Sequence, residues 1–436
     1  MRVPDVSAIV GFMIGMLSIG AVFELSVAEV VEEPLHASKA LTISISIITA
    51  VKFFLFIMII HLRLQFLNTF NCFYMNLKRP LALAAISFCF LITQAQNNKP
   101  VSAPPQSAGV WSVEKANAWY NKHPWLTGAN FIPSNAINQL EMWQAETYDT
   151  VTINRELQWA QDIGFNTMRV FLHSVAWKVD PEGFKKRMDS FLRMAASHKI
   201  KPMFVFFDDC WNKTPQPGKQ PAPKPGIHNS GWVQDPGQAK SSDTTEFPEL
   251  EKYVKNVLLR FAHDERILLW DLYNEPGNSG KGDSSLPLLK KVFSWARQVN
   301  PDQPISVGLW AWNLTNLNAF QFQNSDIITY HDYEEPNWHQ RVIDLLKASG
   351  KPLICTEYMA RTRNSRFSNT YALLKKEKVG AINWGFVEGK SNTIYAWDTP
   401  LPNGSQPTEW FHDIFFRDGK PYRQDEVNLI KKLNDR

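Results

Sequence analysis

From Trp125 almost to its end, the chain alternates short apolar runs with amphipathic stretches. This alternation is typical of parallel strands joined by helices. The predicted strands span residues 127–133, 166–172, 202–208, 267–273, 305–309, 327–330, 353–356 and 381–385. The predicted helices span residues 150–163, 184–198, 248–262, 286–299, 338–348, 369–377 and 424–433. Eight strands that are mostly separated by helices predict a closed α/β barrel, the (β/α)8 TIM barrel, rather than an open sheet.

Composition divides the chain into two parts. All 16 tryptophans lie at or after Trp111, and the first 98 residues are apolar and contain none. Residues 111–436 therefore form one predicted domain, within the roughly 250 to 400 residues of such barrels. The net charge is +4 with acids and bases interspersed, which argues against a nucleic-acid partner. No Gly-x-Gly-x-x-Gly motif follows the first strand, which argues against a dinucleotide fold. Cys210 and Cys355 fall on predicted strands 3 and 7, across the barrel, so no disulfide is expected.

Residues 75–95 have the pattern of a secretory signal peptide. A short basic start at 75–79 precedes an apolar stretch at 81–92, and Thr93-Gln94-Ala95 offers small residues before a cleavage point. Residues 96–110 are rich in proline and form a predicted linker. This pattern predicts a secreted or periplasmic protein.

Residues 1–74 precede that signal and have two interpretations. They contain apolar stretches at 6–23 and 40–60, and about 20 apolar residues are enough to span a bilayer. Under one interpretation they are a membrane anchor of two helices. Under the other, which we favour, translation starts at Met75 and the apolar extension is a start-site error. Membrane association is expected only if the extension is retained.

Two predicted strands end in a glutamate. Asn274-Glu275-Pro276 closes strand 4, and Glu357 closes strand 7, 82 residues later. In a barrel the chemistry lies at the C-terminal ends of the strands. A pair of carboxyls is what sugar hydrolysis needs, because one protonates the leaving oxygen and the other attacks or activates water. We expect Glu275 to be the general acid/base and Glu357 the nucleophile, with pKa values that differ because one charge raises the pKa of the other group.

Other polar residues at strand ends complete a predicted substrate-binding set. Its members are Arg169, Asn274, His331, Tyr333 and Trp384. An arginine inside an apolar strand is rarely buried without a partner, so Arg169 is expected to keep Glu357 charged, although a purely structural ion pair is the alternative. Tyr333 is expected to donate a hydrogen bond to Glu357, and His331 to contact the sugar.

The remaining members have structural alternatives as well. Asn274 is expected to bind the sugar 2-hydroxyl, a contact that strengthens in the transition state. Trp384, at the end of strand 8, is expected to stack on the sugar, or else to be a core tryptophan. Asp208 and Asp209 end strand 3 and either touch substrate or cap the following loop. That loop, residues 211–245, is unusually long and is expected to wall the cleft, to act as a lid, or to be a tolerated insertion.

With these residues in place, the chain resembles the clan A glycoside hydrolases, most closely family 5, the cellulase and mannanase family. The resemblance covers residues 125–392 and rests on Arg169, Asn274-Glu275-Pro276, His331-Asp332-Tyr333, Glu357 and Trp384 in their strand order. It implies a retaining β-glycoside hydrolase that acts without a cofactor on a mannan, glucan or xylan type of β-linked polysaccharide or oligosaccharide. The reaction implied is a double displacement through a glycosyl-enzyme intermediate. Asp208-Asp209-Cys210 stands where that family often has a histidine-asparagine pair. This difference leaves the identity of the polysaccharide substrate open.

The glycoside hydrolase hypothesis has two alternatives. A metal-dependent barrel hydrolase needs clustered histidines, usually His-x-His on strand 1, and residues 127–133 contain none, so no metal is expected. A non-catalytic carbohydrate-binding barrel protein at the cell surface fits the tryptophan content, but it has no need for Glu275 and Glu357. We expect a monomer, and the sequence leaves endo and exo action equally open.

Overall fold

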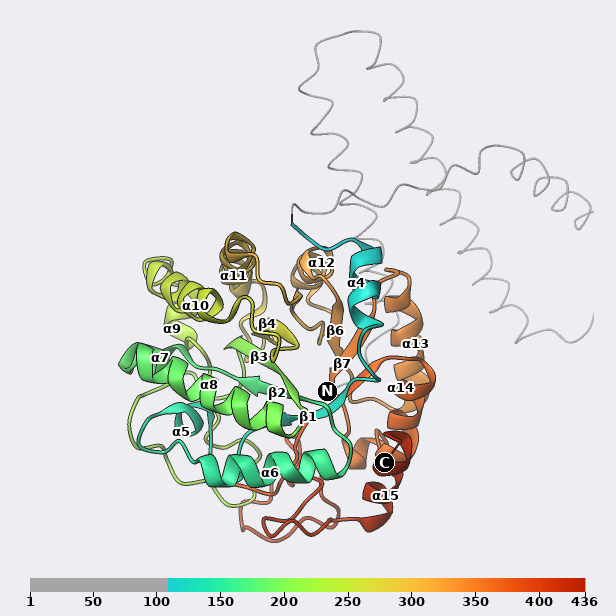
Figure 1. Cartoon of the computed structure of the whole chain (residues 1–436). Helices are drawn as coiled ribbons and strands as arrows, with labels where there is room; N and C mark the ends of the chain where they lie inside the picture. The colour runs from blue at the N-terminus through green and yellow to red at the C-terminus, as the bar shows by residue number, and fades with distance from the viewer. Residues whose placement is uncertain (1–108, 436) are drawn as a thin grey trace, which may run out of the picture. The chain divides into compact units, whose positions relative to one another are not determined.

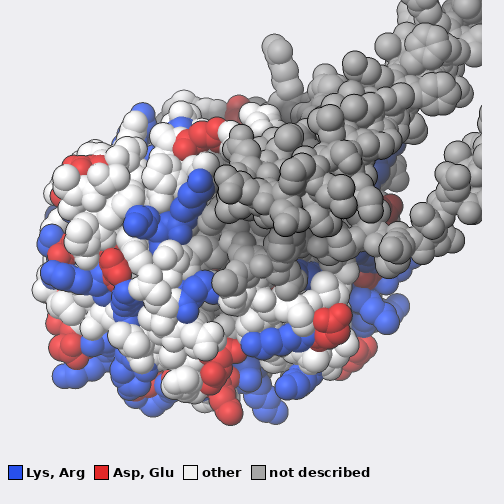
Figure 2. Space-filling view, turned by 90° about the horizontal axis from the view of Figure 1, so that it is seen from above, with Lys and Arg blue, Asp and Glu red and all other residues white. Residues whose placement is uncertain are grey.

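The computed structural model describes residues 109–435 (Figure 1). The predicted signal peptide, the apolar extension and nearly all of the linker lie outside these residues. Among the described residues no helix is both long and apolar enough to cross a bilayer. On the face shown in Figure 2, basic and acidic side chains are interspersed over the surface of the domain.

Eight parallel strands form the centre of the domain. They are β1 (Thr127–Phe131), β2 (Thr167–Phe171), β3 (Lys201–Asp208), β4 (Leu269–Asn274), β5 (Ile305–Ser306), β6 (Ile328–His331), β7 (Leu353–Glu357) and β8 (Gly380–Asn383). Their order in the sheet is β5-β4-β3-β2-β1-β8-β7-β6. A parallel bridge between Leu309 and Tyr330 joins the β5 end of the sheet to β6. The predicted TIM barrel is therefore confirmed.

Helices surround the strands, as Figure 1 shows. They are α4 (Val113–Tyr120), α5 (Gln139–Trp143), α6 (Thr150–Asp162), α7 (Ser174–Val179), α8 (Pro181–Ser197), α9 (Gln238–Ser242), α10 (Phe247–Phe261), α11 (Leu286–Val299), α12 (Thr315–Asn324), α13 (Pro336–Lys347), α14 (Ala372–Lys376) and α15 (Gln424–Leu433). Helix α8 shows how the sequence specifies them. Asp180 caps its first turn by accepting from the Gly183 amide, Pro181 fits the first helical position, and Phe184 and Met188 are buried one turn apart.

The predicted elements need four corrections. Helices α4, α5, α7, α9 and α12 were not predicted; in α12, asparagine and glutamine interrupt the apolar spacing. Strand β5 is shorter than predicted, and Leu309 contributes only the bridge. The helix predicted over residues 369–377 begins with a π-helical turn, Phe367–Tyr371, before α14. Strand β8 ends at Asn383 and β3 at Asp208, so Trp384 and Cys210 lie just beyond their strands. Cys210 and Cys355 are both free thiols.

Candidate active site

The ends of β4 and β7 bring Glu275 and Glu357 together. One carboxylate oxygen of each residue and one ring nitrogen of His331 lie within 4.8 Å of one another. Glu357 is the last residue of β7, and Glu275 follows the last residue of β4. The side chains are nearly covered, with 6% of Glu357 and 13% of Glu275 exposed.

The backbone at Glu275 is strained. Its φ is 44°, in the left-handed region that costs a non-glycine residue about 1–3 kcal/mol. Such strain persists only where the surroundings fix it. Here the carboxylate accepts from Asn278 Nδ2 at 2.5 Å and from the Cys210 thiol at 3.3 Å, and it lies 2.9 Å from His331 Nδ1. The turn after β4 therefore aims this carboxyl at the mouth of the barrel.

Arg169 lies beneath the two glutamates and is completely buried. Its guanidinium makes four hydrogen bonds, to Asp271, Glu357, Asn130 and Asn274, at 2.7 to 2.9 Å, and a second nitrogen lies 2.8 Å from the same Asp271 oxygen. The ion pair with Glu357 is the contact expected from the sequence. Because Arg169 is completely buried and each of its three guanidinium nitrogens already binds the protein, it is placed to position Glu357, while its contact with substrate stays a prediction.

The residues after β6 contact both carboxyls. The Tyr333 hydroxyl donates to Glu357 Oε2 at 2.7 Å, as expected. His331 Nδ1 lies 2.9 Å from Glu275 Oε1 and 3.5 Å from Glu357 Oε2, so its ring bridges the pair. Burial lowers the pKa of His331 to about 4, so the ring is neutral at neutral pH. Its Nε2 is buried without a hydrogen-bond partner among the described residues.

Burial raises the pKa of both glutamates. At Glu357 the ion pair with Arg169 and the hydrogen bond from Tyr333 oppose that rise. Among the described residues no lysine or arginine forms an ion pair with Glu275, whose hydrogen-bond partners are the Cys210 thiol, Asn278 and His331. When the pair shares one proton, the cation beside Glu357 therefore favours placing the proton on Glu275.

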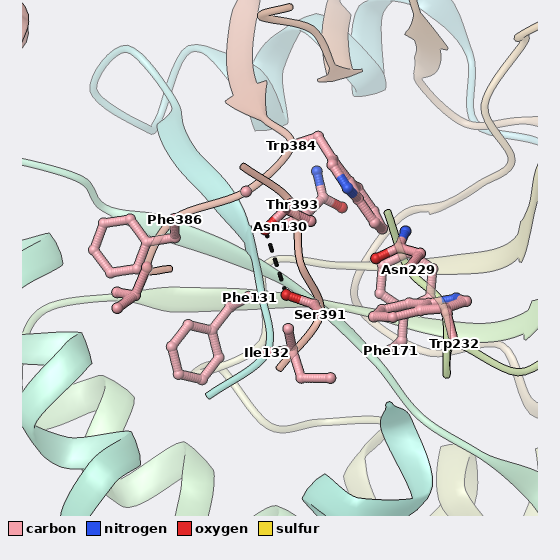
Figure 3. A pocket seen from close by; sticks show the side chains of 12 residues that line it. Asn130, Phe131, Ile132, Phe171, Asn229, Trp232, Trp384, Phe386, Ser391 and Thr393 are labelled. Atoms are coloured by element: carbon pink, nitrogen blue, oxygen red, sulfur yellow. Dashed lines mark hydrogen bonds between the residues drawn. The ribbon is translucent and has the colours of Figure 1, made fainter. Parts of the chain in front are cut away.

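The other two predicted sugar contacts lie next to this centre. Asn274 Oδ1 accepts from Arg169, and its Nδ2 donates to Asp208 at 2.9 Å and to the Cys210 sulfur at 3.3 Å, so both ends of the amide already bind protein. Trp384 is 8% exposed and lines a pocket with Asn130 and Trp232 (Figure 3). The edge of the Trp384 ring meets Trp232, with 5.5 Å between centroids.

Comparisons with known proteins identify the family of this domain. Residues 127–389 match the family model described as cellulase, glycosyl hydrolase family 5. This chain belongs to glycosyl hydrolase family 5. No curated protein sequence matches it.

Solved structures share the fold of this family-5 chain at low identity. The GH5_18 protein of Streptomyces cattleya, in complex with Manβ1-4GlcNAc, has a TM-score of 0.52 and 11% identity over 72% of this chain and 81% of its own. The exo-β-1,4-mannosidase Op5Man5 of Opitutaceae bacterium strain TAV5 has a TM-score of 0.50 and 16% identity, over 76% of this chain and 62% of its own. The endo-β-1,4-mannanase of Thermotoga petrophila has a TM-score of 0.46 and 16% identity, over 70% and 76%. Family membership makes the chain an O-glycosyl hydrolase that acts on β-glycosides.

Sequence reasoning missed two supports of the family-5 site. Asn130 on β1 accepts from Arg169 and donates to the carbonyl oxygens of Thr356 and Asn383, so it ties the guanidinium to the neighbouring strands. Asp271 on β4 is the second carboxylate paired with Arg169. An aspartate within an apolar run was a usable signal, since a buried charge needs a partner. Asn130 gave no comparable signal.

Asp208 and Asp209 accept hydrogen bonds from other groups of the protein. Asp208 accepts from Asn274 Nδ2 and from the Trp232 indole at 2.7 Å. Asp209 accepts from the hydroxyl of Tyr273 and the backbone amide of Gly277, both at 2.8 Å, so it fixes the turn after β4. Of the two roles considered from the sequence, loop fixation is the one that the contacts support.

Glu275, His331 and Glu357 are also the described residues that are close enough to share a metal ion. Their atoms suit zinc, which accepts histidine and carboxylate ligands. However, Arg169 places a permanent positive charge 2.8 Å from Glu357. A divalent cation there would face direct repulsion, so the site fits an acid/base pair better than a metal centre.

Proposed function

We propose that the chain hydrolyses a β-linked oligosaccharide or polysaccharide of the mannan, glucan or xylan type by a retaining double displacement. The separation of the carboxyls carries the proposal. Retaining enzymes place them about 5–5.5 Å apart, and inverting enzymes about 6.5–9.5 Å apart to admit a water. Oxygens of Glu275 and Glu357 within 4.8 Å of each other support the retaining class.

In the first step Glu357 attacks the anomeric carbon while Glu275 donates its proton to the leaving oxygen. Arg169 and Tyr333 keep Glu357 ionised and aimed. Glu275 suits the acid role because burial raises its pKa and no cation touches it. In the second step Glu275, now ionised, takes a proton from the water that releases the sugar.

Substrate groups have a place beside this pair. His331 Nδ1 faces both carboxyls, whereas its Nε2 is buried on the opposite edge of the ring, so the contact of His331 with a sugar remains part of the proposal. We assign Trp384 the stacking role, because its ring lines the pocket of Figure 3. Asn274 binds the 2-hydroxyl only if it gives up part of its present hydrogen bonding, so that contact remains part of the proposal.

The test is hydrolysis of defined β-1,4-linked oligosaccharides, with the anomer of the first product read by NMR. Retention of the β-anomer is expected, and initial inversion would refute the double displacement. Glu357→Ala is expected to retain binding and lose hydrolysis, which separates the enzyme from a non-catalytic binding protein. Glu335→Ala, at a surface glutamate two residues beyond Tyr333, is the matched control and keeps full activity. Activity that persists with a chelator present excludes the metal-dependent alternative.

Export is part of the proposal and depends on residues 75–95. Cleavage after Ala95 would release residues 96–436 as the mature protein, with a linker ahead of the barrel. N-terminal sequencing of the exported protein tests it. A mature N-terminus within residues 1–74 would instead support the membrane-anchor interpretation.

A further inference from the structure

Two long loops meet over one side of the barrel mouth. They are residues 211–245 after β3 and residues 384–423 after β8. Their backbones are joined directly, because the Asn229 amide donates to the Ser391 carbonyl at 2.8 Å and the Leu401 amide donates to the Gly226 carbonyl at 3.0 Å. We call the joined segments, residues 224–232 and 389–401, the closing wall.

Side chains strengthen the same junction. Asn392 Nδ2 donates to the carbonyl oxygens of Lys224 and Ile227, at 2.8 and 3.1 Å. His228, buried in the wall, donates from Nδ1 to the carbonyl oxygen of Tyr395 at 2.8 Å. Burial lowers the pKa of His228 to about 4, so this bond is made by a neutral ring and does not vary with pH near neutrality.

The loop after β1 seals the base of the wall. The Lys390 amide donates to the Ser134 carbonyl at 3.0 Å, and Asn138 Nδ2 donates to the Gly231 carbonyl at 2.8 Å. Lys390 also forms an ion pair with Glu141 at 2.6 Å. Loops from β1, β3 and β8 are thus tied together, which covers the mouth over β1 and β2.

Glycines at the junction show how closely the loops approach. A Cβ added at Gly226 would lie 1.6 Å from the Leu401 carbonyl oxygen, and one added at Gly389 would lie 2.7 Å from that of Ser134. Both distances are below any real Cβ contact, so the backbones touch. A polysaccharide chain has no passage between them.

The closing wall stands on the nucleophile's side of the site. Trp397, in the same loop after β8, meets Tyr333 with 4.8 Å between ring centroids, and Tyr333 binds Glu357. On the wall's inner side, Figure 3 shows Asn229 and Ser391 around the pocket that Trp384 lines. The loop after β6, residues 332–335, is short and forms no comparable barrier. The closing wall therefore bounds the site on the side of Glu357, which leaves the side of Glu275 as the way out for the rest of a substrate in the proposal below.

We propose that the enzyme is exo-acting and removes single sugars from the non-reducing end. The inference rests on the proposed function and adds the mode of attack. The terminal sugar lies between the closing wall and Glu357, with its anomeric carbon at Glu357, and the rest of the substrate extends past Glu275 to solvent. The bond from C1 to the bridging oxygen breaks, Glu275 protonates that oxygen, and water supplies the hydroxyl of the released monosaccharide and returns a proton to Glu275.

The test uses β-1,4-linked hexaoses of mannose, glucose and xylose that carry 18O at the reducing-end anomeric position. Products are followed by mass spectrometry below about 5% conversion. Exo action predicts one unlabelled monosaccharide for each labelled pentaose, with no labelled di- or trisaccharide. Labelled short fragments from the start would overturn the exo assignment while leaving the glycosidase intact. Folded protein that hydrolyses none of the three series would overturn the proposed function, and this inference with it.

A variant of Asn392 tests whether the closing wall blocks one end of the site. Asn392→Gly removes the two side-chain bonds across the junction, and glycine tolerates the φ of 60° at this position. The share of labelled di- and trisaccharides is expected to rise at least fivefold. The control is Asn403→Gly, because the Asn403 side chain binds only Ser405 in its own loop. An unchanged product pattern in folded Asn392→Gly would overturn the assignment of closure to this junction.

Discussion

Replacing Arg169 with lysine keeps the positive charge but reduces the N–H donors from five to three. At least one of the four hydrogen bonds to Asp271, Glu357, Asn130 and Asn274 must then be lost. A buried polar group without its partner costs about 1–3 kcal/mol, so the free energy of unfolding should fall by about 1–3 kcal/mol for each bond lost.

The effect on catalysis follows from the bond to Glu357. A hydrogen bond to a charged group contributes about 1.5–3 kcal/mol, which corresponds to a loss in kcat of roughly 10- to 150-fold at about 1.36 kcal/mol for each factor of ten. Losing part of the cation's contact also raises the pKa of Glu357. The acid limb of the profile of kcat/KM against pH should therefore move to higher pH in Arg169→Lys.

Arg361→Lys is the matched control. Arg361 is also completely buried and donates to Glu426 and to the carbonyl oxygens of Trp410 and Asp413, without touching either glutamate of the site. Urea unfolding followed by tryptophan fluorescence should show similar destabilisation in both variants. Only Arg169→Lys should lose kcat and shift the pH profile when rates are corrected for folded protein. Equal activity in the two variants would refute the positioning role of Arg169.

Three further predictions follow from contacts of single residues. Tyr333→Phe removes the donor to Glu357, so the acid limb of the kcat/KM profile should rise by about one pH unit, and an unmoved limb would contradict the contact. Cys210→Ala removes a hydrogen-bond donor that lowers the pKa of Glu275, so the basic limb of the kcat/KM profile should move to higher pH. Cys210→Ser keeps a donor and should keep the wild-type basic limb. A shifted basic limb in Cys210→Ser would count against the hydrogen bond. Burial raises the pKa of Asp235 from 3.8 to about 8, so the folded state keeps a proton that the unfolded chain releases. The free energy of unfolding should therefore fall as pH rises from about 4 to 8. In Asp235→Asn the free energy of unfolding, measured with urea across that range, should fall less. Parallel curves for the two proteins would disprove the assignment.

The sequence alone determined the barrel and the position of its chemistry. Periodic apolar runs mark buried strands because each strand must hide both faces, and a glutamate that ends such a run lies at the mouth. The same logic placed Arg169 beside Glu357, since a charge in an apolar strand needs a partner. Helix α12 escaped prediction because its packing does not depend on an apolar stripe.

Tertiary structure alone decided how the site is completed. The pairing of Arg169 with Asp271, Asn130 and Asn274 joins strands 39 to 105 residues apart, and no local pattern encodes such contacts. The strained backbone at Glu275 is likewise imposed by its surroundings. Whether residues 211–245 wall an open cleft or close one end depends on hydrogen bonds to a loop more than 150 residues away. Each of those bonds ends on a backbone carbonyl oxygen, which every residue carries, so side-chain identity could not reveal the partner.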